Sequence, residues 1–228
     1  MRILRNVFRR RLRAFLTIFG ITIGVFALVV MGSMAEKINL LVDGGTRYYS
    51  DKVTISDAST TAGGMSFTPI SVDRVAEIEE VTGVAKASAS VYILLDEEGG
   101  MSMGVPQGIL GSDMRNVEHE SFELTMASGR DLTADDRGKC AVGSDVAKAL
   151  GAEVGGTVEL RGEAFEVVGI YDKTLTAPDN TVVVSLADVQ RMLYAQLPAM
   201  IQQQVKPDEL ATGITAYPEQ GVDPDRLA

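Results

Sequence analysis

The sequence predicts an α+β protein with one N-terminal transmembrane helix followed by a domain on the far side of the membrane. Three observations support this: an uncharged stretch at residues 14–34, a run of arginines before it, and alternating strand-like and helix-like segments after it. At a rise of about 1.5 Å per residue, the uncharged stretch spans about 31 Å, close to the hydrocarbon thickness of a bilayer.

The basic residues before this stretch predict its orientation. Residues 1–13 carry a formal charge of +6, whereas the rest of the chain carries −16. Basic flanks remain in the cytoplasm, so we expect a cytoplasmic N-terminus, oriented by Arg9, Arg10, Arg11 and Arg13. Apolar residues at helical spacing between the arginines predict that residues 1–13 are an amphipathic segment on the cytoplasmic membrane surface.

A cleaved signal peptide is the alternative interpretation of the N-terminus. Ser33-Met34-Ala35 has the small-x-small pattern of a cleavage site. The uncharged stretch is longer than the roughly 7–15 apolar residues of a signal peptide, which favours a retained helix. Apolar residues at helical spacing continue beyond Met34, and no proline precedes Pro69. We therefore expect a transmembrane helix with its stalk over residues 14–49.

Residues 50–228 are predicted to form the extracytoplasmic core domain. Apolar alternation predicts strands at residues 52–56, 84–95, 101–110, 122–126, 158–160, 165–171, 181–185 and 214–217. Helical spacing and capping residues predict helices at residues 71–81 with Ser71 as the cap, 144–150 closed by Gly151, 186–197, and one beginning at Asp223-Pro224. Turn-forming residues predict a loop at 57–68, turns at 97–100 and 161–163, and an irregular connection at 198–212.

Composition excludes several functions. An acidic domain has little attraction for nucleic acid, and we expect no nucleic-acid partner. The only cysteine, Cys140, allows no intrachain disulfide and is interpreted as a small buried apolar residue. His119 between two glutamates could suggest a metal site, but adjacent residues on a strand or turn point in different directions. Asp131 and Asp135-Asp136 could suggest calcium, but no EF-hand-like series is present and a solvated turn is expected. With no nucleotide-binding, hydrolase or metalloprotease motif, we expect no catalytic residue, metal or cofactor.

Six segments of the chain carry a resemblance to a known family. They are Leu12–Val25, Ser128–Asp136, Val142–Leu150, Val154–Val158, Phe165–Ile170 and Leu186–Leu193. Together, and in this order, they resemble the permeases of MacB/FtsX-type ABC transporters over nearly the whole chain. Each segment alone is a weak signal, and the ordered series is a strong one.

The resemblance implies a two-lobed extracytoplasmic domain. Residues 50–115 and 180–228 would form a βα lobe like the porter domains of efflux pumps, and residues 116–179 an inserted mainly-β lobe. Such permeases have four transmembrane helices, of which this chain would hold the first. A helix that starts at Asp223-Pro224 just before Ala228 leads us to expect a chain truncated before further transmembrane helices.

The implied function is that of a permease subunit, represented by its N-terminal portion. ATP hydrolysis by a cytoplasmic ABC ATPase would move the extracytoplasmic domain, for export or for lipoprotein or peptide handling. The implied partners are that ATPase, a second permease subunit in a homo- or heterodimer, the lipid bilayer, and a periplasmic or cell-wall component. The location would be the cytoplasmic (inner) membrane, and the chain itself would not be an enzyme.

Gly20 and Gly24 form a small-xxx-small pair in the uncharged stretch. Such glycines permit close approach of two helices, so we expect a packing face toward a second subunit or further helices, although glycine is common in membrane helices. Two other functions stay open. One is an FtsX-like regulator of a cell-wall hydrolase, and the other is a single-pass membrane-anchored binding module.

Overall fold

The computed structural model describes residues 11–57, 61–62, 65–66, 69–96, 106–113, 119–120, 122–224 and 227. By its internal contacts the chain divides into two compact units, residues 1–43 and residues 44–228. Each unit is described by itself below.

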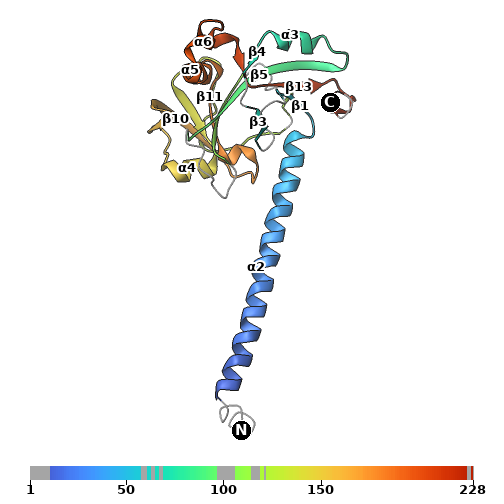
Figure 1. The fold of residues 1–228 in the computed structure, drawn as a ribbon, viewed down its shortest axis with the longest axis vertical. Helices are drawn as coiled ribbons and strands as arrows, with labels where there is room; N and C mark the ends of the chain where they lie inside the picture. The colour runs from blue at the N-terminus through green and yellow to red at the C-terminus, as the bar shows by residue number, and fades with distance from the viewer. Residues whose placement is uncertain are drawn as a thin grey trace. The chain divides into compact units, whose positions relative to one another are not determined.

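Helix α2 (Arg11–Tyr49) makes up the described part of the first unit and ends within the second (Figure 1). The residues predicted as a transmembrane helix and stalk are thus helical throughout, while their division into a membrane span and a stalk stays a prediction. The hydroxyl groups of Thr17 and Thr22 donate to the carbonyls of Arg13 and Ile18, at 3.0 and 2.8 Å, so these polar groups are satisfied within the helix. Among the described residues, one helical segment, residues 13–46, is long and apolar enough to cross a membrane by length and composition.

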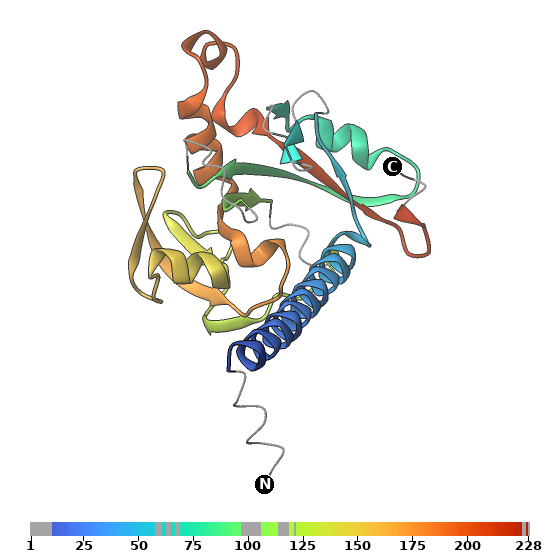
Figure 2. The ribbon, with the colours of Figure 1, turned by 60° about the horizontal axis from the view of Figure 1, so that its bottom comes forward.

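The second unit is built on a nine-stranded mixed sheet. Its strands, in spatial order, are β1 (Val53–Ile55), β13 (Gly213–Pro218), β5 (Val84–Leu94), β6 (Gly108–Ser112), β11 (Thr181–Ser185), β8 (Lys139–Val142), β10 (Glu163–Tyr171) and β7 (Met126–Gly129), with β9 (Thr157–Leu160) paired to β10. The pairs β6–β11 and β8–β10 are parallel, and the others are antiparallel. Figure 2 shows the β9–β10 hairpin in gold at the left.

The two faces of the sheet bury different clusters, because successive residues of a strand point to opposite faces. Cys140 and Val142 of β8 belong to the main core, whereas Ala141 between them belongs to a smaller cluster on the other face. Val167 and Val168 of β10 are divided in the same way. Side chains of α4 (Ser144–Leu150) and α5 (Leu186–Gln196) complete the main core.

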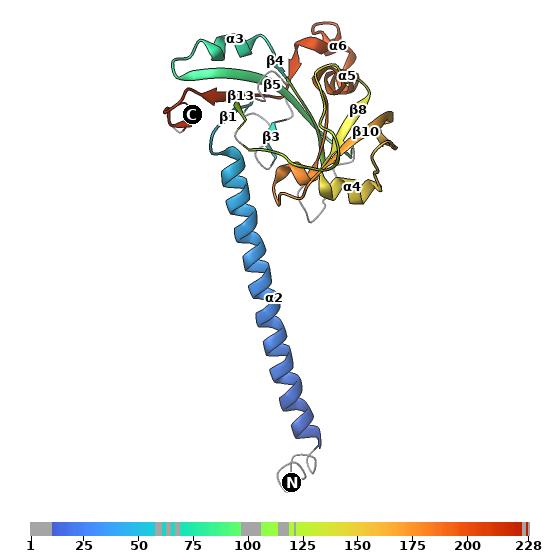
Figure 3. The same cartoon turned by 180° about the vertical axis from the view of Figure 1, so that it is seen from behind.

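The remaining elements are short. They are α3 (Arg74–Glu79), which packs on β5 and β13, α6 (Ala199–Gln202) beside α5 (Figure 3), the 3-10 helices η3 (Ala177–Asn180) and η4 (Pro207–Glu209), and the paired strands β4 (Ile70–Ser71) with β12 (Leu210–Ala211) and β2 (Thr61–Ala62) with β3 (Met65–Ser66).

Several predictions from local sequence are confirmed. The helix at residues 144–150 has its predicted bounds and ends at Gly151, whose φ of +63° is the left-handed conformation of a C-terminal cap. The strand at residues 181–185 also has its predicted bounds. Arg161 and Gly162 form the predicted tight turn, both with positive φ, as two-residue hairpin turns require.

The predicted cap of the helix at residues 71–81 is wrong. The helix is shorter, Arg74–Glu79, and its N-cap residue is Asp73. Ser71 instead pairs with Leu210 in the β4–β12 ribbon, and its Oγ accepts a hydrogen bond from the Asp73 amide at 3.2 Å. The predicted loop at residues 57–68 also needs correction, because it contains the β2–β3 pair.

Two further predictions of local structure are wrong. The strand predicted at residues 122–126 starts only at Met126, because Phe122 packs its ring against Tyr48 and is not part of the sheet. The connection predicted to be irregular, residues 198–212, contains α6, η4 and β12. The Gln202 side chain organises α6 by donating to the carbonyls of Tyr194 and Leu197 at the end of α5, at 3.0 and 2.9 Å.

The hairpin predicted for residues 84–110 is confirmed as an antiparallel β5–β6 pair, with β6 shifted to residues 108–112. The predicted turn at residues 97–100 lies outside the described residues, as does most of the helix predicted after Asp223. Strands from residues 116–179 and from the flanking segments share the one sheet, through the β8–β11 pair. The division into two lobes stays a prediction.

Candidate functional site

The end of helix α2, where it lies in the core-domain unit, is the candidate functional site. Residues 44–49 of the helix belong to the same compact unit as the sheet. The residues that hold this end are Gly44, Tyr48, Lys52, Glu120 and Tyr217, which we call the helix junction. They come from three places in the sequence, and no single motif links them.

A partly buried ion pair lies at the centre of the helix junction. The Lys52 ammonium donates to both carboxylate oxygens of Glu120, at 2.7 and 2.8 Å. The Lys52 side chain is only 7% exposed and that of Glu120 30%. The Tyr217 hydroxyl, from β13, donates to the same carboxylate at 3.2 Å. Burial, and then the charge of Glu120, raise the pKa of Tyr217, so the phenol remains a donor at neutral pH.

Aromatic contacts tie the same lysine to the helix. The Lys52 Nζ atom lies 3.9 Å from the centre of the Tyr48 ring, in the last turn of α2. The Tyr48 ring in turn packs edge-to-face on Phe122, with ring centres 5.4 Å apart and planes at 81°. Such cation–π and edge-to-face contacts each contribute about 0.5–1.5 kcal/mol. Lys52 is therefore held between an aromatic face and a carboxylate.

Gly44 provides the second contact of the helix end. A Cβ atom at this position would lie 2.7 Å from Cγ2 of Thr176, closer than real Cβ contacts allow. Glycine thus permits the chain before β11 to approach the helix. Gly44 and Tyr48 are four residues apart, and residues at that spacing share one face of a helix. Both contacts are therefore made by the same face of the last turn.

The chain segment that meets Gly44 is itself fixed by a buried carboxylate. Asp179 accepts hydrogen bonds from the amide of Thr174 at 2.8 Å, its hydroxyl at 2.9 Å and the amide of Leu175 at 2.7 Å. Leu175 has a φ of +59°, an uncommon conformation for a leucine. Because these bonds over-determine the loop, the surface offered to Gly44 is well defined. Pro178 follows in the 3-10 helix η3.

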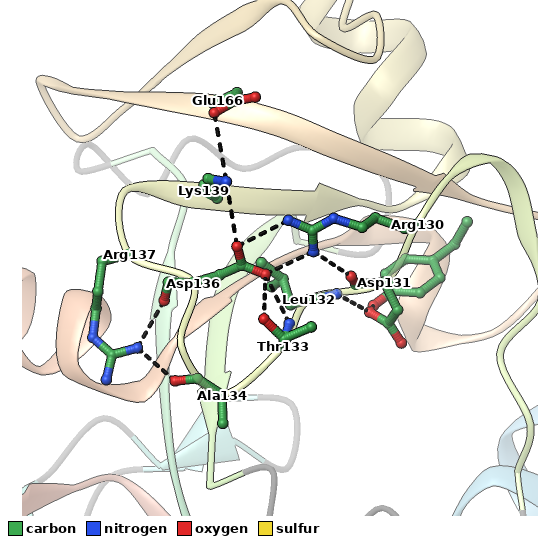
Figure 4. A network of polar contacts seen from close by, with 10 residues as sticks. Arg130, Asp131, Leu132, Thr133, Ala134, Asp136, Arg137, Lys139 and Glu166 are labelled. Carbon is green, nitrogen blue, oxygen red and sulfur yellow. Dashed lines mark hydrogen bonds and ion pairs between the residues drawn. The ribbon is translucent and has the colours of Figure 1, made fainter.

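A second polar network lies in the segment between β7 and β8 (Figure 4). Asp136 is buried, so the solvated turn predicted at Asp135-Asp136 is wrong for this residue. Its carboxylate accepts one hydrogen bond from each terminal guanidinium nitrogen of Arg130, at 2.7 and 2.9 Å, and from the amide and hydroxyl of Thr133, at 2.8 and 2.9 Å. Lys139 lies 3.4 Å away. The hydrogen bonds from Arg130, followed by those from Thr133, hold the pKa of Asp136 well below its usual range.

The neighbouring carboxylate completes this network. Asp131 accepts from the Leu132 amide at 2.8 Å and from the Tyr171 hydroxyl of β10 at 2.6 Å. Burial, and then the hydrogen bond to Asp131, raise the pKa of Tyr171. Arg130 links the two aspartates, because it also donates to the Asp131 backbone carbonyl at 2.8 Å, so the network holds the segment between the two strands in place.

A family comparison covers almost the entire chain. The sequence model of the MacB-like periplasmic core domain matches residues 14–228. The chain belongs to this family. Its members are components of ABC-transporter permeases, which are not themselves catalytic. A periplasmic core domain with an apolar helix of this length before it indicates a protein of the inner membrane.

Solved structures of other proteins are similar to the chain at low sequence identity. No curated protein matches the chain. One similar solved structure is the periplasmic region of MacB from Actinobacillus actinomycetemcomitans, at 13% identity, 79% coverage of this chain, 81% of that chain and a TM-score of 0.49. Another is the extracellular domain of the noncanonic ABC-type transporter YknZ from Gram-positive bacteria, at 14% identity, 75% and 84% coverage and a TM-score of 0.47.

The MacB-like family match confirms the resemblance found in the sequence and the expected fold class. Arg130, Thr133 and Asp136 all lie in the Ser128–Asp136 segment that carries part of this resemblance, and in the structure the first two bond to Asp136.

The site residues predicted from the sequence lie outside the helix junction. Gly20 and Gly24 are exposed on α2, and a Cβ atom at either would meet nothing within 4 Å in the structure. Arg13 is exposed, Arg11 begins the helix, and Arg9 and Arg10 lie outside the described residues. The packing and orientation roles of these residues stay predictions.

Cys140 is fully buried, and burial raises the pKa of its thiol to about 12, as its interpretation as an apolar core residue requires. Across the described part of the chain, no three His, Cys, Asp or Glu side chains are grouped as a metal site would need. His119 lies beside Tyr217, with ring centres 6.1 Å apart.

The helix junction itself is not among the sites predicted from the sequence. Lys52 is predicted only as a strand residue, and Glu120 only as a neighbour of His119. The available signal is a lysine just beyond an apolar helix and a tyrosine pair, Tyr48-Tyr49, but nothing in it identifies Glu120 as the partner, 68 residues away.

Proposed function

We propose that the chain is the N-terminal portion of a permease subunit of a MacB/FtsX-type ABC transporter. A separate cytoplasmic ABC ATPase hydrolyses ATP, and a second permease subunit pairs with this one in the membrane. Helix α2 conveys their movement to the extracytoplasmic core domain. The domain then acts in export, or in the handling of lipoproteins or peptides.

The observation that carries this proposal is the MacB-like family match over residues 14–228. Two features of the chain support the mechanism. Helix α2 runs without a proline from Arg11 to Tyr49, so a continuous hydrogen-bonded helix links the apolar stretch to its last turn. One face of that last turn, through Gly44 and Tyr48, is held in the core-domain unit by close packing and by the Lys52–Glu120 pair.

The proposed orientation has the N-terminus in the cytoplasm, because Arg9, Arg10, Arg11 and Arg13 precede the apolar stretch. Labelling of introduced cysteines tests it in a Cys140→Ala background. A membrane-impermeant maleimide should label Met200→Cys, a position 76% exposed in the domain, in intact spheroplasts. It should label Asn6→Cys only after permeabilisation. Labelling of Asn6→Cys in intact spheroplasts contradicts the orientation.

A second experiment tests the transporter assignment. The gene product, tagged and purified from its host membranes into lipid nanodiscs, should bring with it a protein with ATPase activity. The Lys52→Met variant should retain that ATPase but couple less well, seen as ATP turnover with a smaller ATP-driven change in distance between spin labels on two copies of the domain.

The matched control is Lys206→Met, at a lysine whose side chain is 74% exposed and paired with the exposed Glu209. This variant should couple as the wild type does. Purification with no ATPase but with a cell-wall hydrolase or with no partner favours the FtsX-like regulator or the anchored binding module, respectively, over the transporter.

A further inference from the structure

A cavity of about 160 Å³ lies on the face of the sheet opposite the main core. Its floor is a row of three half-buried side chains on adjacent strands, Tyr92, Leu110 and Val183. The strand register pairs Tyr92 with Leu110 and Leu110 with Val183, so the three point to the same face side by side. Engineered apolar cavities of about 150 Å³ bind benzene, so the space is large enough for one small ring.

The Tyr92 ring that borders this space has a fixed position. Its edge lies against Gly108, so closely that a Cβ atom there would overlap with the ring. Gly213, next to Ser90 in the register, also has no side chain to fill the space. Gly213 thus leaves the space open, and Gly108 makes room for the Tyr92 ring that borders it.

The walls of the cavity are rich in hydroxyl groups and have no formal charge. Seven of the thirteen described lining residues are Ser, Thr or Tyr, and none of the thirteen is charged. Three of these hydroxyls use their hydrogen on backbone carbonyls: Thr181 donates to Ala177 at 2.9 Å, Ser90 to Gly213 at 3.3 Å and Tyr92 to Pro106 at 3.5 Å. A hydroxyl that donates its hydrogen keeps its lone pairs as acceptors. Ser90 and Thr181 can therefore each accept a hydrogen bond from a ligand that carries a donor.

We infer that this cavity binds a small, neutral, mainly apolar molecule that carries one hydroxyl or N–H donor. The apolar floor accounts for the body of the ligand, and the acceptor hydroxyls of Ser90 and Thr181 account for its polar group. A charged ligand is disfavoured, because it would lose its hydration without meeting an opposite charge. Small phenols and alcohols have this chemistry.

The cavity lies next to the helix junction. Tyr48 of the helix junction and Pro178 of η3 both line it. A bound molecule therefore contacts the last turn of α2 and the segment that follows its Gly44 contact. The binding site does not depend on the transporter assignment, since it is defined by the core-domain unit alone.

The test measures binding of 4-fluorophenol to the full chain in lipid nanodiscs by ¹⁹F NMR line broadening. Two comparison probes are fluorobenzene, which lacks the donor, and 4-fluorobenzoate, which is anionic at pH 7.5. We expect 4-fluorophenol to bind most tightly and 4-fluorobenzoate to show no binding above that of empty nanodiscs. Equal binding of 4-fluorobenzoate overturns the inference.

Two variants locate the binding. Val183→Phe fills the cavity floor and should abolish binding, whereas the control Val154→Phe, at an exposed valine that does not line the cavity, should leave it unchanged. Retained binding in a Val183→Phe protein with wild-type circular dichroism overturns the inference.

Thr181→Val covers the case in which Val183→Phe does not fold, since it keeps the side-chain shape and removes one acceptor. This variant should weaken the binding of 4-fluorophenol by about 2- to 10-fold, as the loss of one hydrogen bond predicts, and leave the binding of fluorobenzene unchanged. An equal effect on both probes, or on neither, contradicts the assigned donor–acceptor chemistry. These outcomes bear on the cavity and leave ATPase copurification, the test of the transporter proposal, untouched.

Discussion

Replacing Lys52 with methionine removes the charge at the centre of the helix junction and keeps most of the side-chain volume. The Lys52 side chain is 7% exposed and Glu120 is 30% exposed, so the pair lies between the surface and buried cases. Breaking a fully buried pair costs about 3–5 kcal/mol, and an exposed pair contributes about 0–1 kcal/mol. Because methionine also removes the cation–π interaction with Tyr48, we expect Lys52→Met to lower the free energy of unfolding by about 2 kcal/mol.

The assay is thermal unfolding followed by circular dichroism, since the chain has no tryptophan to report by fluorescence. For a domain of this size, about 2 kcal/mol corresponds to a fall in Tm of about 4–8 °C. The control Lys206→Met removes a lysine that is 74% exposed and should change stability by less than about 0.5 kcal/mol.

A double-mutant cycle isolates the ion pair from other effects of the substitution. Glu120→Gln should also destabilise the protein, because Lys52 then lacks its carboxylate. The double variant should lose less than the sum of the two single losses, by about 1–2 kcal/mol. If the two losses add, the charges do not act together, and the role given to this pair in holding the helix end is refuted.

Individual contacts lead to three further predictions. A Cβ atom at Gly45 would meet nothing within 4 Å, so Gly45→Ala should raise the free energy of unfolding by about 0.5–1 kcal/mol through helix propensity. Gly44→Ala should give no such gain, because its Cβ atom would meet Cγ2 of Thr176, and Thr176→Ser, which removes that methyl group, should restore the gain. Chemical unfolding measures both substitutions. Because the pKa of Asp136 is depressed in the fold, its carboxylate stabilises the fold above about pH 4, and this stabilisation decreases as pH falls below that value. The difference in Tm between the wild type and Asp136→Asn should therefore be largest at pH 7 and smaller in thermal unfolding at acidic pH. Cys140 should resist a thiol reagent at pH 7 in the folded chain and react once guanidinium unfolds it, as absorbance of the released thiol dye reports.

Features decided by a few neighbouring residues could be predicted from the sequence. The left-handed Gly151 ends α4 where expected, and the apolar run of residues 181–185 forms a strand with its predicted bounds. Both depend on backbone preference or apolar alternation within one segment. The family resemblance supplied the fold class for the same reason, as an ordered series of such local segments.

Features that depend on partners far apart in the sequence could not be predicted. Phenylalanine is common in strands, but the ring of Phe122 packs on Tyr48 and the strand starts four residues later. Glu120 meets Lys52 across 68 residues and Tyr217 across 97. No periodicity or motif carries such pairings, since they are set by which strands lie side by side. The helix junction therefore becomes visible only when the sheet order is known.

The sheet order also bears on how a movement of the helix end would spread through the domain. One face of the last turn makes two contacts: Gly44 meets the segment that leads through η3 into β11, and Tyr48, through Lys52 and Glu120, reaches Tyr217 of β13. Strands β11 and β13 are inner strands that flank the β5–β6 pair, so each is hydrogen-bonded on both sides. A rotation of the last turn would move both contacts together and would apply a force to the sheet at β11 and β13 at once. Such a force would move the domain as a rigid body, because bending the sheet would break hydrogen bonds on both sides of each strand. Under the proposed function, removing one contact, as in Lys52→Met, should then leave the other intact and reduce the coupled movement without stopping ATP hydrolysis.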